Sequence, residues 1–204
     1  MPIIEFKNVS FEYEPKKLVL DRLSFVLNTG DKLALTGDSG SGKTTVLRLL
    51  LGLERPTDGK ITGLGECRFS TVFQEDRLIP SLTAEQNVMV VKRSKRRSSE
   101  EADFRDFVNH LFQAAGLSAF LKKYPSELSG GQRRRIAILR AVAYGGDILL
   151  LDEPLKGLDP AMKCCMANLI ADNFNTIFLV SHEKEEIELL HCSRTVHLPS
   201  KLLP

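Results

Sequence analysis

The spacing of apolar and polar residues along the first part of the chain predicts β-strands followed by one helix. Residues 3–13 and 18–27 alternate apolar and polar side chains, as half-buried strands do. Residues 31–37 form a short apolar stretch, which predicts a buried strand. Residues 44–53 then follow a helical pattern, with Gly52 near the end of the expected helix.

The middle of the chain changes to a mostly helical pattern. Residues 55–60 have the composition of a turn, and residues 68–74 predict one further strand. From about residue 82 to residue 144 the pattern is helical, and a loop at residues 123–131 interrupts it. We expect this stretch to form a helical subdomain.

Strand and helix patterns alternate in the last part of the chain. They predict, in order, a strand at 147–154, a helix at 159–174, a strand at 175–182, a helix at 183–192 and a strand at 194–198. Such alternation indicates a mostly parallel sheet with helices on both faces. We therefore predict one α/β domain over residues 1–204, with a core at 1–75 and 146–204 and an inserted helical subdomain at 76–145.

Composition excludes several classes of protein. Of the 204 residues, 43% are hydrophobic and 26% are charged, which is typical of a globular chain rather than a disordered one. The net charge of +2 gives no reason to expect general nucleic-acid binding. The first residues lack a basic segment followed by an apolar core, and no apolar run approaches the length of a membrane span. We expect neither a signal peptide nor a transmembrane helix.

The cysteines and one charge run suggest no chemistry of their own. None of the four cysteines has C-x-x-C spacing, and a reduced, cytosolic setting fits them best. We interpret Cys164 and Cys165 as packing residues on different faces of a helix. Residues 91–101 could contact anionic headgroups or nucleic acid, but their acidic end favours a solvated loop.

Residues 37–45, GDSGSGKTT, fit the pattern of a phosphate-binding loop. The segment follows an expected buried strand and opens an expected helix, which is the context that the pattern requires. Its glycines let backbone N–H groups surround phosphates, and the helix N-terminus adds positive potential. Lys43 is expected to contact the β- and γ-phosphates, and the Thr44 hydroxyl to bind Mg²⁺. The alternative is a glycine-rich turn that binds no ligand. The candidate ligand-binding residues are Gly37, Asp38, Ser39, Gly40, Ser41, Gly42, Lys43, Thr44 and Thr45.

Two adjacent carboxylates, Asp152 and Glu153, end the apolar stretch at residues 147–154. In open α/β sheets ligands collect at the carboxyl ends of strands. Asp152 is therefore expected to hold Mg²⁺ through water, and Glu153 to act as the general base on an attacking water. Two acids at an ordinary strand end are the alternative, and the phosphate loop in the same chain favours the catalytic interpretation.

A second glycine-containing loop, LSGGQ at residues 128–132, is also followed by a helical pattern. Its Ser129, Gly130 and Gly131 are placed to offer backbone N–H groups to an anion at a helix N-terminus. A chain with two such loops raises the question of which phosphate each one binds.

Together these motifs resemble the nucleotide-binding subunits of ABC transporters, a family whose signature sequence is LSGGQ. The resemblance extends from Ile3 to about Leu198, with every motif in family order. It implies that ATP and Mg²⁺ are bound. It also implies an ABC ATPase fold: a P-loop NTPase core with a mostly parallel sheet, N-terminal antiparallel strands and an inserted α-helical subdomain.

The resemblance assigns roles to residues whose own chemistry leaves the role open. Tyr13 matches the aromatic residue on which adenine stacks, although alone it would be a strand aromatic. Gln74 matches the glutamine that contacts Mg²⁺ and the catalytic water, although alone it would be a surface glutamine. His182 matches the histidine that contacts the γ-phosphate, although a lone histidine there would be structural. The matches to the signature and to the aspartate at the dimer interface are Ser129, Gly130, Gly131, Gln132 and Asp159.

The family arrangement implies an answer to the question of the two loops. The signature loop of one subunit lies over the ATP held by the phosphate loop of a second subunit, so the resemblance implies a homodimer with an isologous interface. ATP binding would close this dimer, and hydrolysis would open it. The other expected partners are transmembrane permease subunits and, through them, a substrate-binding protein, whereas no nucleic acid is expected. The expected location is cytoplasmic, on the inner face of the cell membrane.

Two segments resemble one group of importers within the family. Residues 73–88 and 152–160 are similar to those of bacterial importers of the nitrate, sulfonate and taurine group. Ser81 departs from this pattern where relatives often have tryptophan, and Glu183 where aspartate is common. We expect the ATP-hydrolysing subunit of a membrane importer, with a nutrient or anion as cargo. The alternative is a soluble ABC ATPase clamp acting on ribosomes or DNA. Among transporter subunits, an exporter or lipoprotein-releasing subunit also stays possible.

Overall fold

The computed structural model describes residues 2–15, 17–91 and 98–199, which form two compact units. The first unit combines residues 1–69, 146–152 and 174–204, and the second combines residues 70–145 and 153–173. The second unit is thus inserted twice into the sequence of the first. The expected subdomain boundaries at residues 76 and 145 stay a prediction, and most of the charge run at 91–101 lies outside the described residues.

The first unit contains a three-stranded antiparallel sheet with the order β2-β1-β4. Strands β1 (Pro2–Glu12) and β2 (Leu18–Asn28) confirm the alternation in the sequence, because their inward-facing side chains are buried. Strand β4 (Asp58–Thr62) corrects the prediction of a turn at 55–60, since Lys60 pairs with Lys7 of β1. The residues of β4 are almost all exposed, as expected at the edge of a sheet, so they leave no apolar alternation to detect.

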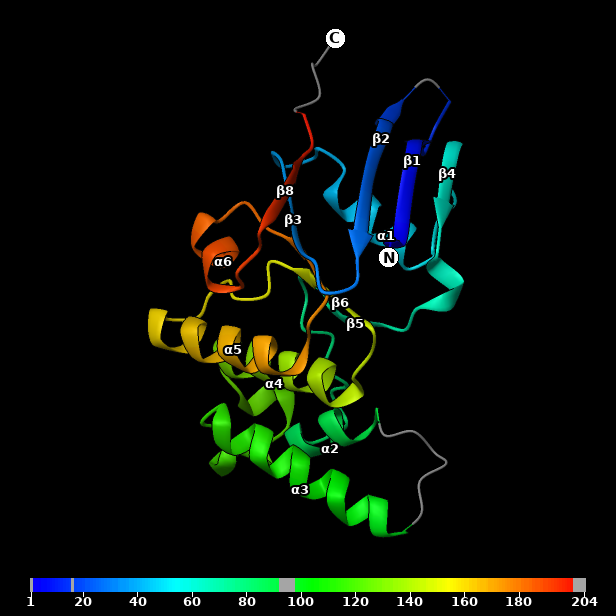
Figure 1. The fold of residues 1–204 in the computed structure, drawn as a ribbon. Coiled ribbons are helices and arrows are strands. Elements are labelled where there is room, and N and C mark those ends of the chain that lie inside the picture. The colour runs from blue at the N-terminus through cyan, green and yellow to red at the C-terminus, as the bar shows by residue number, and fades with distance from the viewer. Residues whose placement is uncertain (1, 16, 92–97, 200–204) are drawn as a thin grey trace. The chain divides into compact units, whose positions relative to one another are not determined.

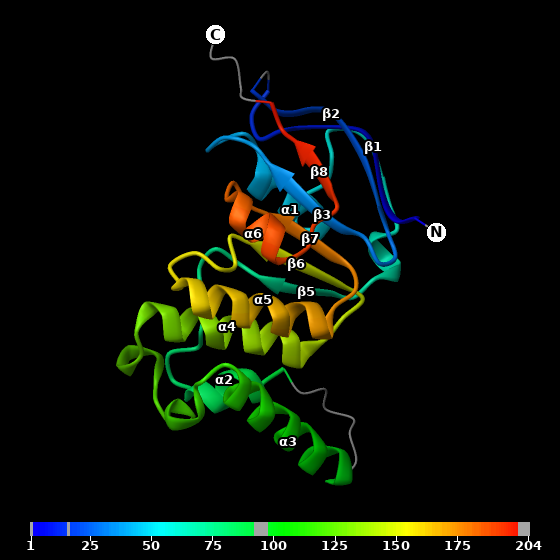
Figure 2. The ribbon, with the colours of Figure 1, turned by 60° about the vertical axis from the view of Figure 1, so that its left-hand side comes forward.

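Parallel strands form the other sheet of the first unit. Strands β6 (Ile148–Asp152), β7 (Ile177–Val180), β3 (Lys32–Thr36) and β8 (Arg194–His197) lie side by side in that order (Figure 2). Helix α6 (Lys184–Leu189) connects β7 to β8, helix α1 (Lys43–Leu50) follows β3, and the short turn η1 (Leu64–Glu66) follows β4. All residues of β6 and β7 are buried, which confirms the prediction of a parallel sheet within an α/β fold.

An aromatic stack joins the two sheets of the first unit. Phe25 of β2 stacks on Phe6 of β1, with ring centroids 4.4 Å apart, and on Phe178 of β7, at 5.6 Å. Phe6 and Phe178 are fully buried. The stack lies in one continuous apolar core that includes leucines of β3 and α1. The sheet that carries the phosphate loop is therefore closely packed against the antiparallel sheet.

The second unit is mostly helical and is arranged around α4 (Gly130–Tyr144). Helix α4 packs against α5 (Pro160–Asn173), α2 (Ala84–Met89) and α3 (Ser98–Ala114), and Figure 1 shows it between α5 and the α2–α3 pair. Strand β5 (Phe69–Val72) leads into this unit, and the short turns η2 (Ser118–Phe120) and η3 (Pro125–Glu127) precede α4. Helices α2, α3 and α4 confirm the helical stretch predicted from residue 82 to residue 144 over its described residues, and residues 92–97 lie outside them.

The cysteines are free thiols. The Cys165 thiol donates a hydrogen bond to the Ala114 carbonyl at 3.2 Å, and burial raises the pKa of Cys192 to about 11. Cys164 is exposed, so the interpretation of this residue as a packing residue was wrong. Its position one residue from Cys165 turns it by about 100° around the helix, toward solvent.

Among the described residues, no helix combines the length and the apolar character needed to cross a membrane.

Candidate functional site

The phosphate loop has the backbone geometry that its glycines predict. Strand β3 ends at Thr36, helix α1 begins at Lys43, and Gly42 is the N-cap residue of that helix with φ of 102°. Gly40 also has a positive φ, of 79°. Only glycine adopts such angles without strain, and a Cβ at Gly42 would lie 2.9 Å from a methyl group of Leu20. The chain therefore turns sharply into α1, whose first N–H groups have no helical partner.

Polar side chains of the loop fit an anionic ligand. The Lys43 ammonium donates to the carbonyl oxygens of Gly37 and Asp38 at 2.6 and 2.7 Å, which places its charge on the loop. The Ser41 hydroxyl is buried and, among the described residues, has no hydrogen-bond partner. Buried hydroxyls are normally bonded, so an unbonded one in a cation-bearing loop favours a phosphate oxygen as its partner. Thr44, at the start of α1, is exposed and can offer its hydroxyl outward.

Tyr13 lies beside this loop. It follows the end of β1, its side chain is about half exposed, and its hydroxyl is 3.4 Å from the Thr45 hydroxyl of α1. Its ring contacts Phe11 edge-on, with centroids 4.8 Å apart. An exposed ring face supported by a buried aromatic is suited to stacking with a flat ligand.

Asp152 and His182 lie at the same edge of the parallel sheet as the loop. Asp152, at the end of β6, pairs with Val180 of β7, and Val180 pairs with Leu35 of β3, just before the loop. His182 is exposed and comes two residues after β7 ends. The strand order thus confirms that residues far apart in the sequence meet at one carboxyl edge, where ligands of such sheets bind. The carboxylate of Asp152 and the hydroxyl of Thr44 are the hard oxygen donors that suit Mg²⁺.

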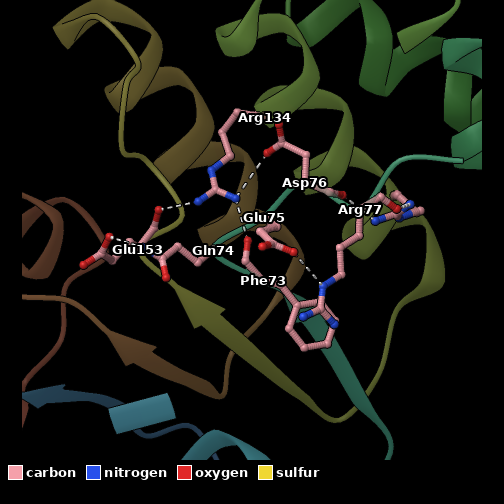
Figure 3. Close-up of polar contacts among 8 residues, drawn as sticks. Phe73, Gln74, Glu75, Asp76, Arg77, Arg134 and Glu153 are labelled. Atoms are coloured by element: carbon pink, nitrogen blue, oxygen red, sulfur yellow. Dashed lines mark hydrogen bonds and ion pairs between the residues drawn. The ribbon is translucent and has the colours of Figure 1, made fainter. Parts of the chain in front are cut away.

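The second unit brings Gln74 to Glu153. The Gln74 side-chain amide lies 3.5 Å from a carboxylate oxygen of Glu153 (Figure 3), and Lys156 donates to the same oxygen at 2.6 Å. The Glu153 side chain is largely buried, so its contacts with Lys156 and Gln74 limit its rotation. Sequence reasoning assigned no role to Lys156, and its spacing of three residues from Glu153 is the signal that could have found it.

A buried arginine was also missed. The Arg134 side chain is 6% exposed and lies between the backbone of residues 73–76 and that of Glu153 (Figure 3). Its position on the buried face of α4, in line with Ile138 and Ala141, is the signal in the sequence, because a charge on such a face needs buried partners. One partner is Asp76. Burial raises the pKa of Asp76, and the charge of Arg134 opposes this effect only in part.

The signature loop forms the first turn of α4. Ser129 is the N-cap residue: its hydroxyl accepts from the Gln132 N–H, and the Gln132 side chain accepts from the Ser129 N–H at 2.8 Å. These two side chains therefore serve the helix itself, which leaves the N–H groups of the exposed Gly130 and the half-buried Gly131 to bind an anion. Asp159 is exposed and accepts from the Met162 N–H at 3.1 Å, as a cap of α5.

The predicted residues thus fall into two sets. The first unit contains Tyr13, residues 37–45, Asp152 and His182. The second unit contains Gln74, residues 129–132, Glu153 and Asp159. The individual catalytic and binding roles stay predictions.

Comparisons with known proteins agree with these motifs. A family model described as "ABC transporter" matches residues 20–156. The aliphatic sulfonates import ATP-binding protein SsuB 1 of Rhodococcus jostii (strain RHA1) is 37% identical over 180 residues, which are 84% of this chain and 70% of that protein. The Nod factor export ATP-binding protein I of Burkholderia orbicola (strain AU 1054) is 38% identical, over 94% of this chain and 66% of that protein. The chain spans about half the length of some longer relatives that it matches at 37% identity.

A solved structure has the same fold. The dimeric structure of MJ0796, described as a bacterial ABC transporter cassette, matches with a TM-score of 0.82 and 29% identity, over 96% of this chain and 94% of that chain. Another structure of MJ0796, in a post-hydrolysis state bound to ADP and Pi, matches with the same TM-score at 28% identity.

Proposed function

This chain belongs to the ABC transporter family, and from that premise we propose that it is the subunit that binds and hydrolyses ATP to drive a membrane importer. The observation that carries the proposal is the phosphate loop between β3 and α1, with its left-handed glycines and the Lys43 ammonium held on it. Such a loop binds the phosphates of a nucleotide through backbone N–H groups, and a flanking tyrosine gives the adenine ring a stacking surface.

The chain's own residues perform the hydrolysis in this proposal. Lys43 binds the β- and γ-phosphates, and His182 contacts the γ-phosphate. Glu153 accepts the proton of the attacking water, while Gln74 orients that water. Thr44, Asp152 and Gln74 would hold Mg²⁺, and the ion would supply positive charge that offsets the charge of the phosphates.

A second copy of the chain completes each ATP site. The dimeric arrangement of the similar MJ0796 cassette supports this part of the proposal. Residues 129–132 of one copy bind the ATP held by the phosphate loop of the other, with Asp159 at the interface. The two glycine loops of one chain therefore bind the phosphates of two different ATP molecules.

We further propose that residues 78–88 dock on a permease subunit and keep the chain at the inner face of the membrane. Ile79, Pro80 and Ser81 are exposed, and Ile79 is a large apolar residue. The shape of this turn is fixed from inside by Asn87, which is fully buried. Its amide accepts from the Ile79 N–H at 2.7 Å and donates to three carbonyls, those of Ile79, Leu82 and Thr83.

Replacing Lys43 with alanine tests the nucleotide site. We expect ATP hydrolysis to fall by about 10²-fold or more and ATP binding to weaken, because the phosphates lose a point charge. Binding is measured by calorimetry and hydrolysis by phosphate release. Lys122, which is exposed on the second unit, provides the matched control Lys122→Ala, and that variant should keep both properties. Turnover at the parent rate in Lys43→Ala would remove Lys43 from the site.

A cysteine at Ser81 tests the docking surface. Ser81 is exposed, whereas Thr83 caps α2 with its hydroxyl, so Ser81→Cys disturbs the turn less. In membranes from the source cell, with Cys164 changed to serine, a thiol crosslinker should join Ser81→Cys to a membrane subunit. A cysteine at the exposed Asn175 should give no such product. Crosslinks only to ribosomal protein or nucleic acid would favour the clamp alternative instead.

A further inference from the structure

One guanidinium connects two peptide groups of the second unit that the sequence separates widely. Arg134 donates through one outer nitrogen to the Phe73 carbonyl at 2.6 Å and through the other to the Glu153 carbonyl at 2.7 Å. The first nitrogen also lies 3.3 Å from the Asp76 carboxylate. Figure 3 shows the guanidinium between these groups. Because the guanidinium is planar and rigid, it fixes the distance between the two peptide groups.

Each of these peptide groups carries a residue of the proposed ATPase machinery. The Phe73 carbonyl belongs to the peptide bond that leads into Gln74, so a hydrogen bond to it orients the backbone from which the Gln74 side chain extends. The Glu153 carbonyl belongs to the peptide bond that leads into Pro154. Proline has no N–H, so this peptide can be held by hydrogen bonding only through its carbonyl.

The backbone at Glu153 needs such support. Glu153 has φ of 46°, a left-handed conformation that is uncommon for residues other than glycine. Residues in such conformations persist only where their surroundings hold them, and they are concentrated at functional sites. Arg134 supplies a charged donor to the carbonyl of this strained residue, while Gln74 and Lys156 contact its side chain.

We propose that Arg134 is a positioning residue for ATP hydrolysis, whose buried guanidinium sets the distance between Gln74 and Glu153. The inference rests on the proposed function of the chain as an ATPase. The described hydrogen bonds of Arg134 go to the carbonyls of Phe73 and Glu153 and to the Asp76 carboxylate, so it acts through the backbone of the residues that it positions. Since it lies in α4, it also ties Gln74 and Glu153 to the helix whose first turn carries residues 129–132.

Arg140 provides a matched comparison on the same helix. It donates to the carbonyls of Asp76 and Arg77, both at 2.8 Å, so it also holds the backbone of the segment that follows Gln74. The structure shows no hydrogen bond from Arg140 to Glu153 among the described contacts. Loss of either arginine should therefore lower stability, but only loss of Arg134 releases Glu153.

The experiment compares Arg134→Met and Arg134→Lys with Arg140→Met in the full chain. Parent activity is measured first, because a parent chain that neither binds nor hydrolyses ATP would overturn the proposed function rather than this inference. We expect kcat to fall by about 10–100-fold in Arg134→Met, with the dissociation constant for ATP within about threefold of the parent value. In Arg140→Met, kcat should stay within about threefold of the parent value at a similar loss of thermal stability.

Two further measurements separate positioning from folding. Arg134→Lys keeps the charge but not the planar fork, so it should fold like the parent and still lose most of the activity. When Arg134→Met is combined with Glu153→Gln, the second change should cost little beyond the first, because the base to be positioned is already absent. Equal losses of kcat in the Arg134 and Arg140 variants, parent-like kcat in both Arg134 variants, or full additivity with Glu153→Gln would overturn the inference.

Discussion

Glu153→Gln should lower kcat for ATP hydrolysis by about 10²–10⁴-fold and leave ATP binding intact, because loss of a general base typically costs this much. Glutamine has nearly the same size as glutamate, so it can keep the contact with Gln74. It cannot accept a proton from water, and it no longer neutralises Lys156. The proposed ligands of the adenine and phosphates, such as Tyr13 and Lys43, are unchanged. The variant should therefore bind ATP and stay closed.

Single-turnover phosphate release and equilibrium binding of ATP check this expectation together. The control is Glu188→Gln, which makes the same change at an exposed position of α6 and should hydrolyse ATP at the parent rate. If Glu153→Gln itself hydrolysed ATP near the parent rate, another residue would have to be the base. His182, at the carboxyl edge of the parallel sheet, would then be the next candidate.

Two inactive chains should together trap ATP that neither traps alone, because the signature loop is proposed to act on the ATP of the other copy. One chain carries Lys43→Ala and the other carries Ser129→Arg, both in the Glu153→Gln background so that closed dimers persist. In the mixed dimer, one site combines both defects, and the other combines an intact phosphate loop with an intact signature loop. We expect about one trapped ATP per mixed dimer and none for either chain alone.

The measurement is nucleotide retained after gel filtration, since one sound site need not support turnover. Ser129→Arg also removes the cap of α4, at a cost of about 1 kcal/mol, so far-UV circular dichroism must show that the variant is folded. The Glu153→Gln chain without other changes is the positive control and should trap about two ATP per dimer. ATP trapped by the Ser129→Arg chain as a monomer, or none in the mixture when the positive control traps it, would exclude action in trans.

Much of the fold followed from the sequence because burial and periodicity coincide in the central elements. Strands β6 and β7 are buried along their whole length, so their apolar runs predict them directly. The phosphate loop was predictable because its glycines stand between a buried strand and a helix. Strand β4 was not, because an exposed edge strand is defined by pairing with β1 rather than by its own side chains.

The residues that support the candidate site were harder to predict than the residues proposed to act in it. The bonds of Arg134 depend on carbonyl groups of residues 73 and 153, which no side-chain pattern records. The resemblance identified Ser129 and Gln132 as ligands, but it did not indicate that the side chain of each accepts a hydrogen bond from the backbone N–H of the other. The bonds of Arg134 are set by tertiary geometry, whereas the spacing of Ser129 and Gln132 is that of a capping box and could have been recognised in the sequence.

The buried amide of Asn87 has a consequence for how this chain could acquire new partners in evolution. The turn at residues 79–83 keeps its shape through hydrogen bonds made from inside, and the side chains of Ile79 and Ser81 are exposed. Substitutions at these exposed positions change the surface that a partner contacts, but they leave the hydrogen bonds of Asn87 in place. On the proposed docking surface, specificity for one permease or another can therefore diverge among descendants of this chain while the ATPase fold remains the same.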